Sequence, residues 1–315
     1  MQSNLLGRTG LSVSRLGFGS GPVGFLGTGQ NQTDRVVASL LDAGVNFFDT
    51  AACYAGGEAA LGHALRGHRD DAVLTTKAGH RVDDDRHDLP AFSPELIAAS
   101  VDRSLQRLHT DHLDVVLLHS CDEETLRRGE ALDALLAARD AGKTRFVGYS
   151  GDNAAAGLAA ADPRVDVLEL SVNVVDQHNA KAVLPVAREH DKGVIAKRPL
   201  ANACWKDLSG QPGMYANYAE EYTRRLAAMR SAGLTPSALG HSGHDEVEWP
   251  DIALRFTLAQ PGVHVAIVGT TSTVHTEMNL AAEANNPLRD EAVERIREAF
   301  DRAEAGDGAA WPSLT

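Results

Sequence analysis

Four side chains in the first half of the chain are suited to acid–base chemistry: Asp49, Tyr54, Lys77 and His119. A tyrosine, whose ordinary pKa is near 10, is a poor acid at neutral pH. A charged lysine beside it favours the phenolate and lowers that pKa, and a carboxylate keeps the lysine charged. A histidine can donate a hydrogen bond to a substrate oxygen and help to relay the proton. These residue types predict proton transfer to or from a bound molecule.

Each of the four residues also has an explanation without catalysis. Asp49 could cap a turn, and Tyr54 could be a core aromatic residue. Lys77 could simply lead to solvent, and His119 could be a hydrogen-bonded core histidine. However, Asp49, Lys77 and His119 end three successive apolar runs. Because a buried ionisable group is costly unless it is partnered, this joint placement favours one shared pocket.

These runs belong to a series of eight short apolar segments, which alternate with amphipathic stretches. Most are continuously apolar, as expected for parallel strands buried on both faces. The predicted strands are Arg15–Phe18, Asn46–Thr50, Ala72–Lys77, Leu113–His119, Phe146–Ser150, Val167–Val172, Gly193–Arg198 and Val263–Gly269. Helical periodicity is clearest in Thr33–Ala43, Glu58–Leu65, Leu126–Ala141, Ala180–His190 and Trp249–Gln260, and a helix is expected to begin at Ser93-Pro94-Glu95.

Eight alternating β and α units predict a closed (β/α)8 TIM barrel in one domain, residues 1–315. An open doubly wound sheet is the alternative, but no G-x-G-x-x-G motif follows an early strand. The nearest candidate is Gly17–Pro22, where the proline interrupts the strand-to-helix turn. Barrel enzymes assemble their sites at the C-terminal ends of the strands. The polar residues at the ends of the predicted strands are therefore expected around one mouth.

Two further segments are predicted outside the barrel units. Leu6–Val13 reads as an N-terminal β-hairpin with Thr9-Gly10 at its bend. Ser209–Glu248 is a long, mixed polar stretch, predicted to be an insertion that contains a helix over Tyr218–Ala232. Long loops are therefore expected on the C-terminal side of the barrel.

Composition excludes several classes of partner. The chain has 315 residues and a formal net charge of −13, which argues against nucleic acid or an anionic membrane as partner. No apolar run approaches the roughly 20 residues that span a bilayer, and no secretory signal is evident. Three distant cysteines, Cys53, Cys121 and Cys204, predict reduced thiols in a cytoplasmic protein. The acidic groups Asp83–Asp85 and Asp122–Glu124 are expected in solvated loops, and no metal site is predicted.

Four segments closely resemble motifs of the aldo-keto reductases. They are Gly44–Ala51 followed by Tyr54, Glu58, Leu61 and Gly62; the lysine strand Val73–Lys77; the histidine strand Leu113–His119; and the G-K-x-R-x-x-G-x-S segment Gly142–Ser150. The resemblance extends from about Leu6 to Asn279. It implies hydride transfer between a nicotinamide cofactor and a carbonyl or alcohol. Tyr54 is the implied general acid, or general base in the oxidation direction, supported by Asp49, Lys77 and His119.

The resemblance also implies a cofactor lying across the barrel mouth. The expected contacts are Gly19, Ser20, Asp49, Ser150, Glu169, Lys197, Arg198, Pro199, Leu200, Ala201, Ile267, Gly269, Thr270, Thr271, Ser272, His275 and Asn279. Ser150 matches the serine that holds the carboxamide. Gly151 replaces the common asparagine, Glu169 the usual glutamine and Lys197 the stacking tyrosine. Glutamate can accept a hydrogen bond from the carboxamide, but it donates one only when protonated.

The choice of cofactor depends on the segment from Ile267 to Asn279, which resembles the adenosine-binding stretch. Its hydroxyls and a helix start suit an anion. The family usually places lysine or arginine here for the 2′-phosphate of NADP, whereas this chain offers only His275 at the arginine position. NADP(H) is the first expectation, from the family, and NAD(H) is the alternative.

The substrate is expected to be a small carbonyl or alcohol that contacts Tyr54, His119, Trp205 and Phe25. Trp205 could equally be plain core. Two other classes of function are considered. A non-catalytic nicotinamide-binding regulatory subunit is the first, because some barrels of this family serve other assemblies. A metal-dependent hydrolase is the second, but the 13 histidines are scattered and no H-x-H ends an early strand. The sequence carries no signal for the number of subunits.

Overall fold

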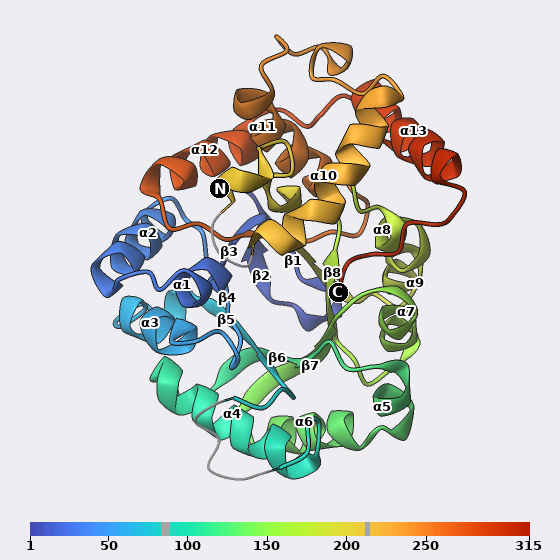
Figure 1. Cartoon of the computed structure of the whole chain (residues 1–315). Coiled ribbons are helices and arrows are strands. Elements are labelled where there is room, and N and C mark those ends of the chain that lie inside the picture. Colours follow the sequence, from blue (N-terminus) through green and yellow to red (C-terminus); the bar gives the residue numbers. More distant parts are fainter. Residues whose placement is uncertain (83–88, 212–214) are drawn as a thin grey trace.

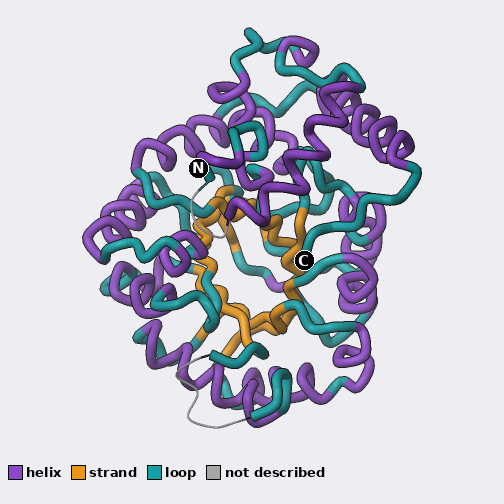
Figure 2. The backbone as a smooth tube through the Cα atoms, in the orientation of Figure 1, coloured by secondary structure: helices purple, strands orange, loops and turns teal. Residues whose placement is uncertain are grey.

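The computed structural model describes residues 1–82, 89–211 and 215–315, so Asp83–Asp85 lie outside the described residues. Eight parallel strands close into a barrel in the order β10-β3-β4-β5-β6-β7-β8-β9. Figure 2 shows them as a central ring surrounded by helices. The strands are β3 (Leu16–Gly19), β4 (Phe47–Asp49), β5 (Val73–Ala78), β6 (Leu113–His119), β7 (Thr144–Ser150), β8 (Val167–Ser171), β9 (Gly193–Lys197) and β10 (Val265–Val268). The predicted (β/α)8 barrel is confirmed, and each predicted strand overlaps an observed one.

The helices enclose the barrel (Figure 1). They are α1 (Gly21–Phe25), α2 (Gln30–Asp42), α3 (Gly57–Ala64), α4 (Pro94–Leu108), α5 (Glu123–Arg128), α6 (Glu130–Asp140), α7 (Asn153–Ala161), α8 (His178–Ala182), α9 (Leu184–Glu189), α10 (Tyr215–Ser231), α11 (Asp245–Leu258), α12 (Thr273–Ala284) and α13 (Asp290–Asp307). Ser93 caps α4 as predicted, accepting a hydrogen bond from the Leu96 N–H. The predicted helix Leu126–Ala141 is broken at Gly129, whose φ of 80° ends α5. Ala180–His190 divides into α8 and α9, with a proline in the first turn of α9.

Strand alternation divides the core into an inner and an outer layer. Successive side chains of a strand point to opposite faces. In β5, for example, Val73 packs inside the barrel, whereas Leu74 packs outward against the helices. β8 follows the same rule with Val167 inside and Leu168 outside. The next inward position on each strand therefore lies nearer the C-terminal mouth.

The N-terminal hairpin closes the other end of the barrel. Its strands, β1 (Ser3–Leu5) and β2 (Ser12–Ser14), pair antiparallel, and the 3-10 turn η1 (Gly7–Thr9) joins them. Leu6, between β1 and η1, is buried in the inner core layer. The hairpin was predicted over Leu6–Val13, but these residues mostly form its connection. The hydrophobic residues there face the barrel as a plug rather than alternating in strands.

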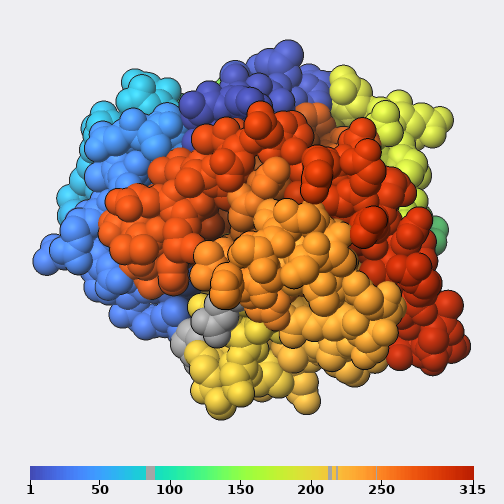
Figure 3. All heavy atoms as spheres, turned by 90° about the horizontal axis from the view of Figure 1, so that it is seen from above, coloured from blue at the N-terminus to red at the C-terminus, as the bar shows by residue number. Residues whose placement is uncertain are grey.

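A third apolar cluster lies beside the barrel. α10, in the predicted insertion, packs against α13, and Figure 3 shows these orange and red segments side by side at the surface. The short turns η3 (Ala201–Ala203), η4 (Leu208–Gly210) and η5 (Ser237–Leu239) connect this region, and η2 (Arg69–Asp71) precedes β5. After α13, the chain returns to the barrel, and its C-terminus lies beside β8 (Figure 1).

Two further predictions from the sequence concerned the state of the cysteines and the lack of a membrane-spanning segment. All three cysteines are free thiols. Among the helices of the described residues, none is long and apolar enough to cross a membrane.

Candidate active site

The site is built from inward-facing positions near the C-terminal ends of the strands. In β4 the inward Phe47 is followed two residues later by Asp49, and the same step places Lys77, His119 and Glu169 at the mouth. The alternation of side chains therefore brings together residues that are far apart in sequence. Asp49, Lys77 and Glu169 are buried, and His119 is half-buried.

Lys77 is the centre of a buried ionic cluster. Its Nζ donates hydrogen bonds to Asp49 Oδ1 at 2.7 Å and Oδ2 at 2.6 Å, and to the Thr50 carbonyl at 3.1 Å. Glu169 Oε2 lies 3.2 Å from the same Nζ. Burial alone would lower the pKa of Lys77, but the charges of Asp49 and Glu169 outweigh burial and raise it. Lys77 is therefore charged, as predicted, with two carboxyl groups as partners instead of one.

Tyr54 lies in the turn between β4 and α3, held by its own backbone. Its N–H donates to the Ala51 carbonyl at 3.0 Å, and its carbonyl accepts from the Gly57 N–H at 2.8 Å. The Lys77 Nζ is 5.5 Å from the centre of its ring. Burial raises the pKa of Tyr54, and Lys77 opposes that rise without reversing it. The predicted direction of the lysine effect is right, but the expectation of a net lowered pKa is wrong, because desolvation dominates.

His119 faces the same space from β6. Its ring centre is 6.2 Å from that of Tyr54 and 5.0 Å from that of His80. Its Nδ1 is 3.5 Å from Cys53 Sγ. Burial, followed by the charge of Lys77, holds the pKa of His119 well below its usual range. A neutral imidazole has one N–H donor and one acceptor nitrogen, which suits it to hydrogen bonding with a substrate oxygen.

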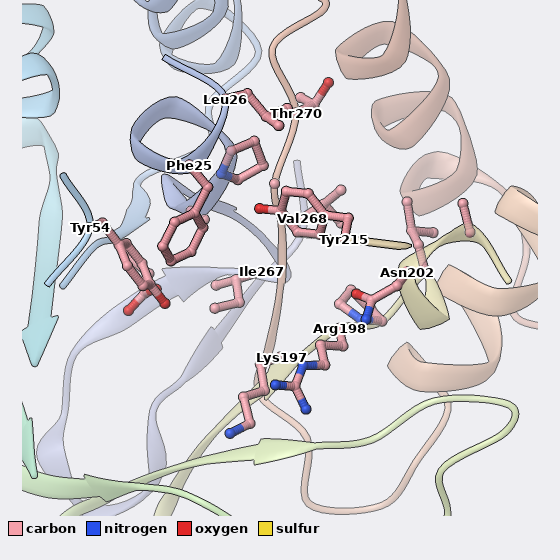
Figure 4. A pocket seen from close by; sticks show the side chains of 18 of the residues that line it. Phe25, Leu26, Tyr54, Lys197, Arg198, Asn202, Tyr215, Ile267, Val268 and Thr270 are labelled. Carbon is pink, nitrogen blue, oxygen red and sulfur yellow. The ribbon is translucent and has the colours of Figure 1, made fainter. Parts of the chain in front are cut away.

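These side chains open into a cavity of about 840 Å³ at the C-terminal mouth. In Figure 4, Tyr54 and Phe25 lie on one side of it, and Lys197 and Arg198 lie on the other. Of the predicted site residues, the structure places these in the lining: Gly19, Phe25, Asp49, Tyr54, His119, Ser150, Glu169, Lys197, Arg198, Pro199, Leu200, Trp205, Ile267, Gly269, Thr270, Thr271, His275 and Asn279. The remaining four, Ser20, Lys77, Ala201 and Ser272, lie outside the lining.

The basic pair at the end of β9, Lys197 and Arg198, already has partners within the protein. Lys197 Nζ lies 3.0 Å from Asp152 Oδ2. Arg198 donates hydrogen bonds to the Leu314 carbonyl and, at 3.3 Å, to Ser171 Oγ. The sequence suggested phosphate binding for this pair, with a salt bridge at the rim as the alternative. The structure shows the salt bridge for Lys197 and places Arg198 where it holds the C-terminal tail.

The loop that follows these cations is strained. Ala201, Asn202 and Ala203 have φ values of 46°, 50° and 52°, in the left-handed region that side chains rarely adopt. Such conformations cost on the order of 1 kcal/mol or more each and concentrate at functional sites. Asn202 and Ala203 line the cavity, so the strain directly shapes its wall.

The opposite wall includes the start of α12. Ser272 caps this helix, its Oγ accepting a hydrogen bond from the His275 N–H at 3.4 Å. Thr270 and Thr271 line the cavity just before the helix, and the exposed His275 lines it within the first turn. Free N–H groups and the positive end of a helix dipole suit an anionic ligand at this position.

The aromatic residues divide between wall and core. Phe25 is 40% exposed and contacts the Tyr54 ring edge-on, with centres 5.0 Å apart. Trp205 lines the cavity but is buried and stacks on Trp249 at 6.4 Å, so it serves as both wall and core.

Sequence reasoning missed several lining residues, among them His80, Lys206, Tyr215 and Thr315. His80, three positions after Lys77, could have been found from the strand end. Lys206 comes from the loop after β9, Tyr215 from the insertion and Thr315 from the tail, where no periodicity marks an inward face.

Gly151 has a local explanation. A Cβ at this position would lie 2.3 Å from the hydroxyl of Tyr149, which donates a hydrogen bond to the Cys121 carbonyl at 2.8 Å. The buried tyrosine therefore excludes a side chain where the resemblance predicted an asparagine.

Comparison with known proteins agrees with this geometry. The model of the family described as "Aldo/keto reductase family" matches residues 15–301. The chain is 30% identical to L-galactose dehydrogenase of Arabidopsis thaliana, over 98% of this chain and 96% of that protein. It is 30% identical to a probable voltage-gated potassium channel subunit beta of Oryza sativa subsp. japonica, over 94% and 95%. The holo form of an aldo-keto reductase from Bacillus halodurans, 26% identical, matches with a TM-score of 0.79 over 95% of this chain and 96% of that chain.

Proposed function

Because this chain belongs to the aldo/keto reductase family, we propose that it is an oxidoreductase that interconverts a carbonyl and an alcohol with NAD(P), using Tyr54 as general acid or base. The observation that carries the proposal is the convergence of Tyr54, His119 and the Lys77 cluster on one cavity. The bound nicotinamide would supply or accept the hydride.

The residues present fit such a cofactor. The cavity volume of about 840 Å³ lies within the range of cofactor sites. Ser150 and Glu169 present a hydroxyl and a carboxyl to the cavity, and Glu169 Oε2 is a buried oxygen with no hydrogen-bond donor among the described residues. The carboxamide of a nicotinamide could form a hydrogen bond with this carboxyl group, accepting one when the carboxyl is protonated. The start of α12 would accept a phosphate.

In the reduction direction, the substrate oxygen gains negative charge and needs a proton. In this proposal the Tyr54 hydroxyl gives that proton, and the nearby charge of Lys77, 5.5 Å from the ring centre, stabilises the phenolate that remains. Neutral His119 donates a hydrogen bond that orients the same oxygen. Phe25, whose ring contacts that of Tyr54, forms part of the cavity wall beside the reacting groups. In the oxidation direction, the same groups take the proton from an alcohol.

We propose NADP(H) as the cofactor, with NAD(H) as the alternative. Lys206 lines the cavity, is exposed and forms no ion pair with a described residue, so it offers a phosphate the cation that His275 alone does not. Titration with the two reduced cofactors is the test. Tighter binding of NADH than of NADPH would overturn this choice.

The test of the catalytic assignment is Tyr54→Phe, which removes one hydroxyl. We expect kcat to fall at least roughly 100-fold, the scale of general acid catalysis. Tyr149→Phe is the matched control, because it removes a buried tyrosine hydroxyl that bonds the Cys121 carbonyl outside the cavity. Near-normal turnover by Tyr54→Phe would refute the assignment.

A regulatory subunit is the second candidate, favoured by the potassium channel relative at 30% identity. The two functions differ in turnover. Reduction of a generic aldehyde such as nitrobenzaldehyde by the wild type, abolished in Tyr54→Phe, would support the enzyme. Cofactor binding without turnover of any carbonyl or alcohol in a broad panel would favour the regulator.

A further inference from the structure

One buried oxygen in the ionic cluster, Glu169 Oε2, has no hydrogen-bond donor within the part of the chain that the structure describes. The Lys77 ammonium has three N–H donors, and all three are used, on the two Asp49 oxygens and the Thr50 carbonyl. Glu169 Oε1 accepts from Ser150 Oγ at 3.1 Å. Glu169 Oε2 lies 3.2 Å from Lys77 Nζ but receives no hydrogen bond from it. A buried carboxylate oxygen without a donor is costly, so a proton on this cluster would relieve it.

The charges point in the same direction. The cluster contains one cation, Lys77, and two carboxyl groups, Asp49 and Glu169, all buried. The two carboxyl groups flank the same ammonium, with Asp49 Oδ2 2.6 Å and Glu169 Oε2 3.2 Å from Lys77 Nζ, and a hydrogen bond between two carboxyl groups requires a proton. Burial, followed by the charge of Glu169, raises the pKa of Asp49 well above its usual range. The favoured state is therefore neutral, with one ammonium, one carboxylate and one carboxylic acid.

Other titratable groups near the cluster do not replace this proton. Tyr54 and His119, which face the cluster from neighbouring elements, are both uncharged at neutral pH, since burial raises the pKa of the phenol and lowers that of the imidazole. Burial likewise raises the pKa of the Cys53 thiol. The next cation along the mouth, Lys197 on β9, is paired with Asp152. No second positive charge is therefore available to Glu169 from these groups.

We propose that Glu169 and Asp49 share one proton and that this pair senses the charge of the nicotinamide. This inference rests on the proposed function. A reduced nicotinamide ring is neutral, whereas an oxidised one carries a positive charge. The pair would keep its proton beside the neutral ring and release it to solvent when the positive ring binds. Only an O–H bond of the carboxyl pair breaks, and the cofactor itself is unchanged.

The consequence is a bias between the two redox states of the cofactor. Release of one proton on binding makes the affinity for oxidised cofactor rise up to about tenfold per pH unit, as long as the unliganded site holds its proton. The affinity for reduced cofactor stays constant over the same range. The site therefore favours oxidised cofactor as pH rises and is suited to taking hydride from an alcohol. A glutamine at position 169 would carry no such proton.

The experiment is calorimetric titration of the wild type with oxidised and with reduced cofactor. Each titration is run in two buffers of different ionisation enthalpy and at several pH values around neutrality. We expect about one proton released with the oxidised form and none with the reduced form. Glu169→Gln should release none, and its preference for oxidised over reduced cofactor should fall at least about tenfold, since it loses a nearby charge.

Glu58→Gln is the matched control. Glu58 is a buried carboxylate outside the cavity lining, held by Thr76, Ser104 and Arg107. This variant should release the proton as the wild type does. If Glu169→Gln released the same proton, or if the wild type bound oxidised cofactor without releasing one, the inference would be wrong while the proposed function stood.

A second measurement needs no cofactor. The infrared spectrum of the unliganded wild type should contain a carboxylic acid band that shifts in heavy water and is missing from Glu169→Gln. Its presence in both proteins would overturn the shared proton at Glu169. If neither oxidised nor reduced cofactor binds, by contrast, both the proposed function and the inference are wrong.

Discussion

Removing the ammonium of Lys77 tests the central interaction of the site. Lys77→Met keeps an unbranched apolar stem but deletes three hydrogen bonds and the positive charge between Asp49 and Glu169. Two buried carboxyl groups then face each other without a cation. Breaking a buried ion pair by removing one partner costs about 3–5 kcal/mol.

The same magnitude follows from protonation. Without Lys77, the folded state favours both carboxyls neutral, which takes one more proton than the cluster holds in the wild type. Protonating a carboxyl of ordinary pKa about 4 at pH 7 costs about 4 kcal/mol, at 1.36 kcal/mol per unit. The raised pKa means that the folded variant binds more protons than the unfolded chain, so its stability falls as pH rises. Lowering the pH to about 5 should therefore reduce the cost to about 1.4 kcal/mol.

Urea unfolding of the wild type and of Lys77→Met at pH 7 and at about pH 5 measures this loss in the free energy of unfolding. The double variant Lys77→Met/Asp49→Asn should recover most of the loss at pH 7, because one of the two carboxyls is gone. Lys192→Met is the control, because this buried lysine donates its hydrogen bonds to the backbone carbonyls of Asp162 and Val165. The reasoning would be refuted by a Lys77→Met loss below about 1 kcal/mol, by a loss equal at both pH values, or by no rescue from Asp49→Asn.

Three further substitutions test separate features. Gly151→Ala places a Cβ 2.3 Å from the Tyr149 hydroxyl and should destabilise by about 1–3 kcal/mol in urea unfolding, and an unchanged midpoint would contradict the steric argument. Burial opposes ionisation of Glu248, but hydrogen bonds from residues 242–244 lower its pKa to about 2. The stabilisation by the ionised Glu248 is thus complete above its ordinary pKa of 4.5 and is lost as the pH falls towards 2. Glu248→Gln should therefore lower the Tm at neutral pH and leave it unchanged at pH 2. An equal loss of Tm at both pH values would exclude this account. Phe25→Ala removes an exposed ring that contacts Tyr54 and should raise KM more than it lowers kcat; the opposite ratio in steady-state kinetics would place Phe25 in the chemistry.

The barrel and the acid–base residues were predictable because they obey local rules. Apolar runs marked all eight strands, and alternation within a strand fixed which residue faces inward at its end. Asp49, Lys77 and His119 follow from that rule alone. The predicted bounds of the hairpin were wrong because Leu6 packs into the inner core layer at the bottom of the barrel and is not part of a strand. The sequence alone does not distinguish these two reasons for a hydrophobic residue.

Other features depend on contacts that no local pattern reveals. The net pKa of Tyr54 depends on its burial, which outweighs the lysine. Arg198 was expected to meet a phosphate, but it bonds the Leu314 carbonyl, more than a hundred positions away. The strained turn at 201–203 was equally invisible, because asparagine favours left-handed backbone only at single positions and the two alanines beside Asn202 do not favour it at all.

The departures from the family pattern fall on one side of the barrel mouth. Gly151 follows β7, Glu169 lies within β8 and Lys197 ends β9, and these three strands are neighbours in the barrel. They are also linked physically, since Asp152, next to Gly151, accepts the Lys197 ion pair and binds the Ser171 N–H of β8 at 2.7 Å. The acid–base residues come instead from β4, β5 and β6 or the turn after β4. The residues proposed to move the proton thus match the family pattern, whereas the departures from it lie together on the side proposed to bind nicotinamide. Replacing Lys197 alone with the tyrosine of the family pattern would leave Asp152 buried without its cation. The Lys197→Tyr variant should therefore lose stability unless Asp152 is replaced as well.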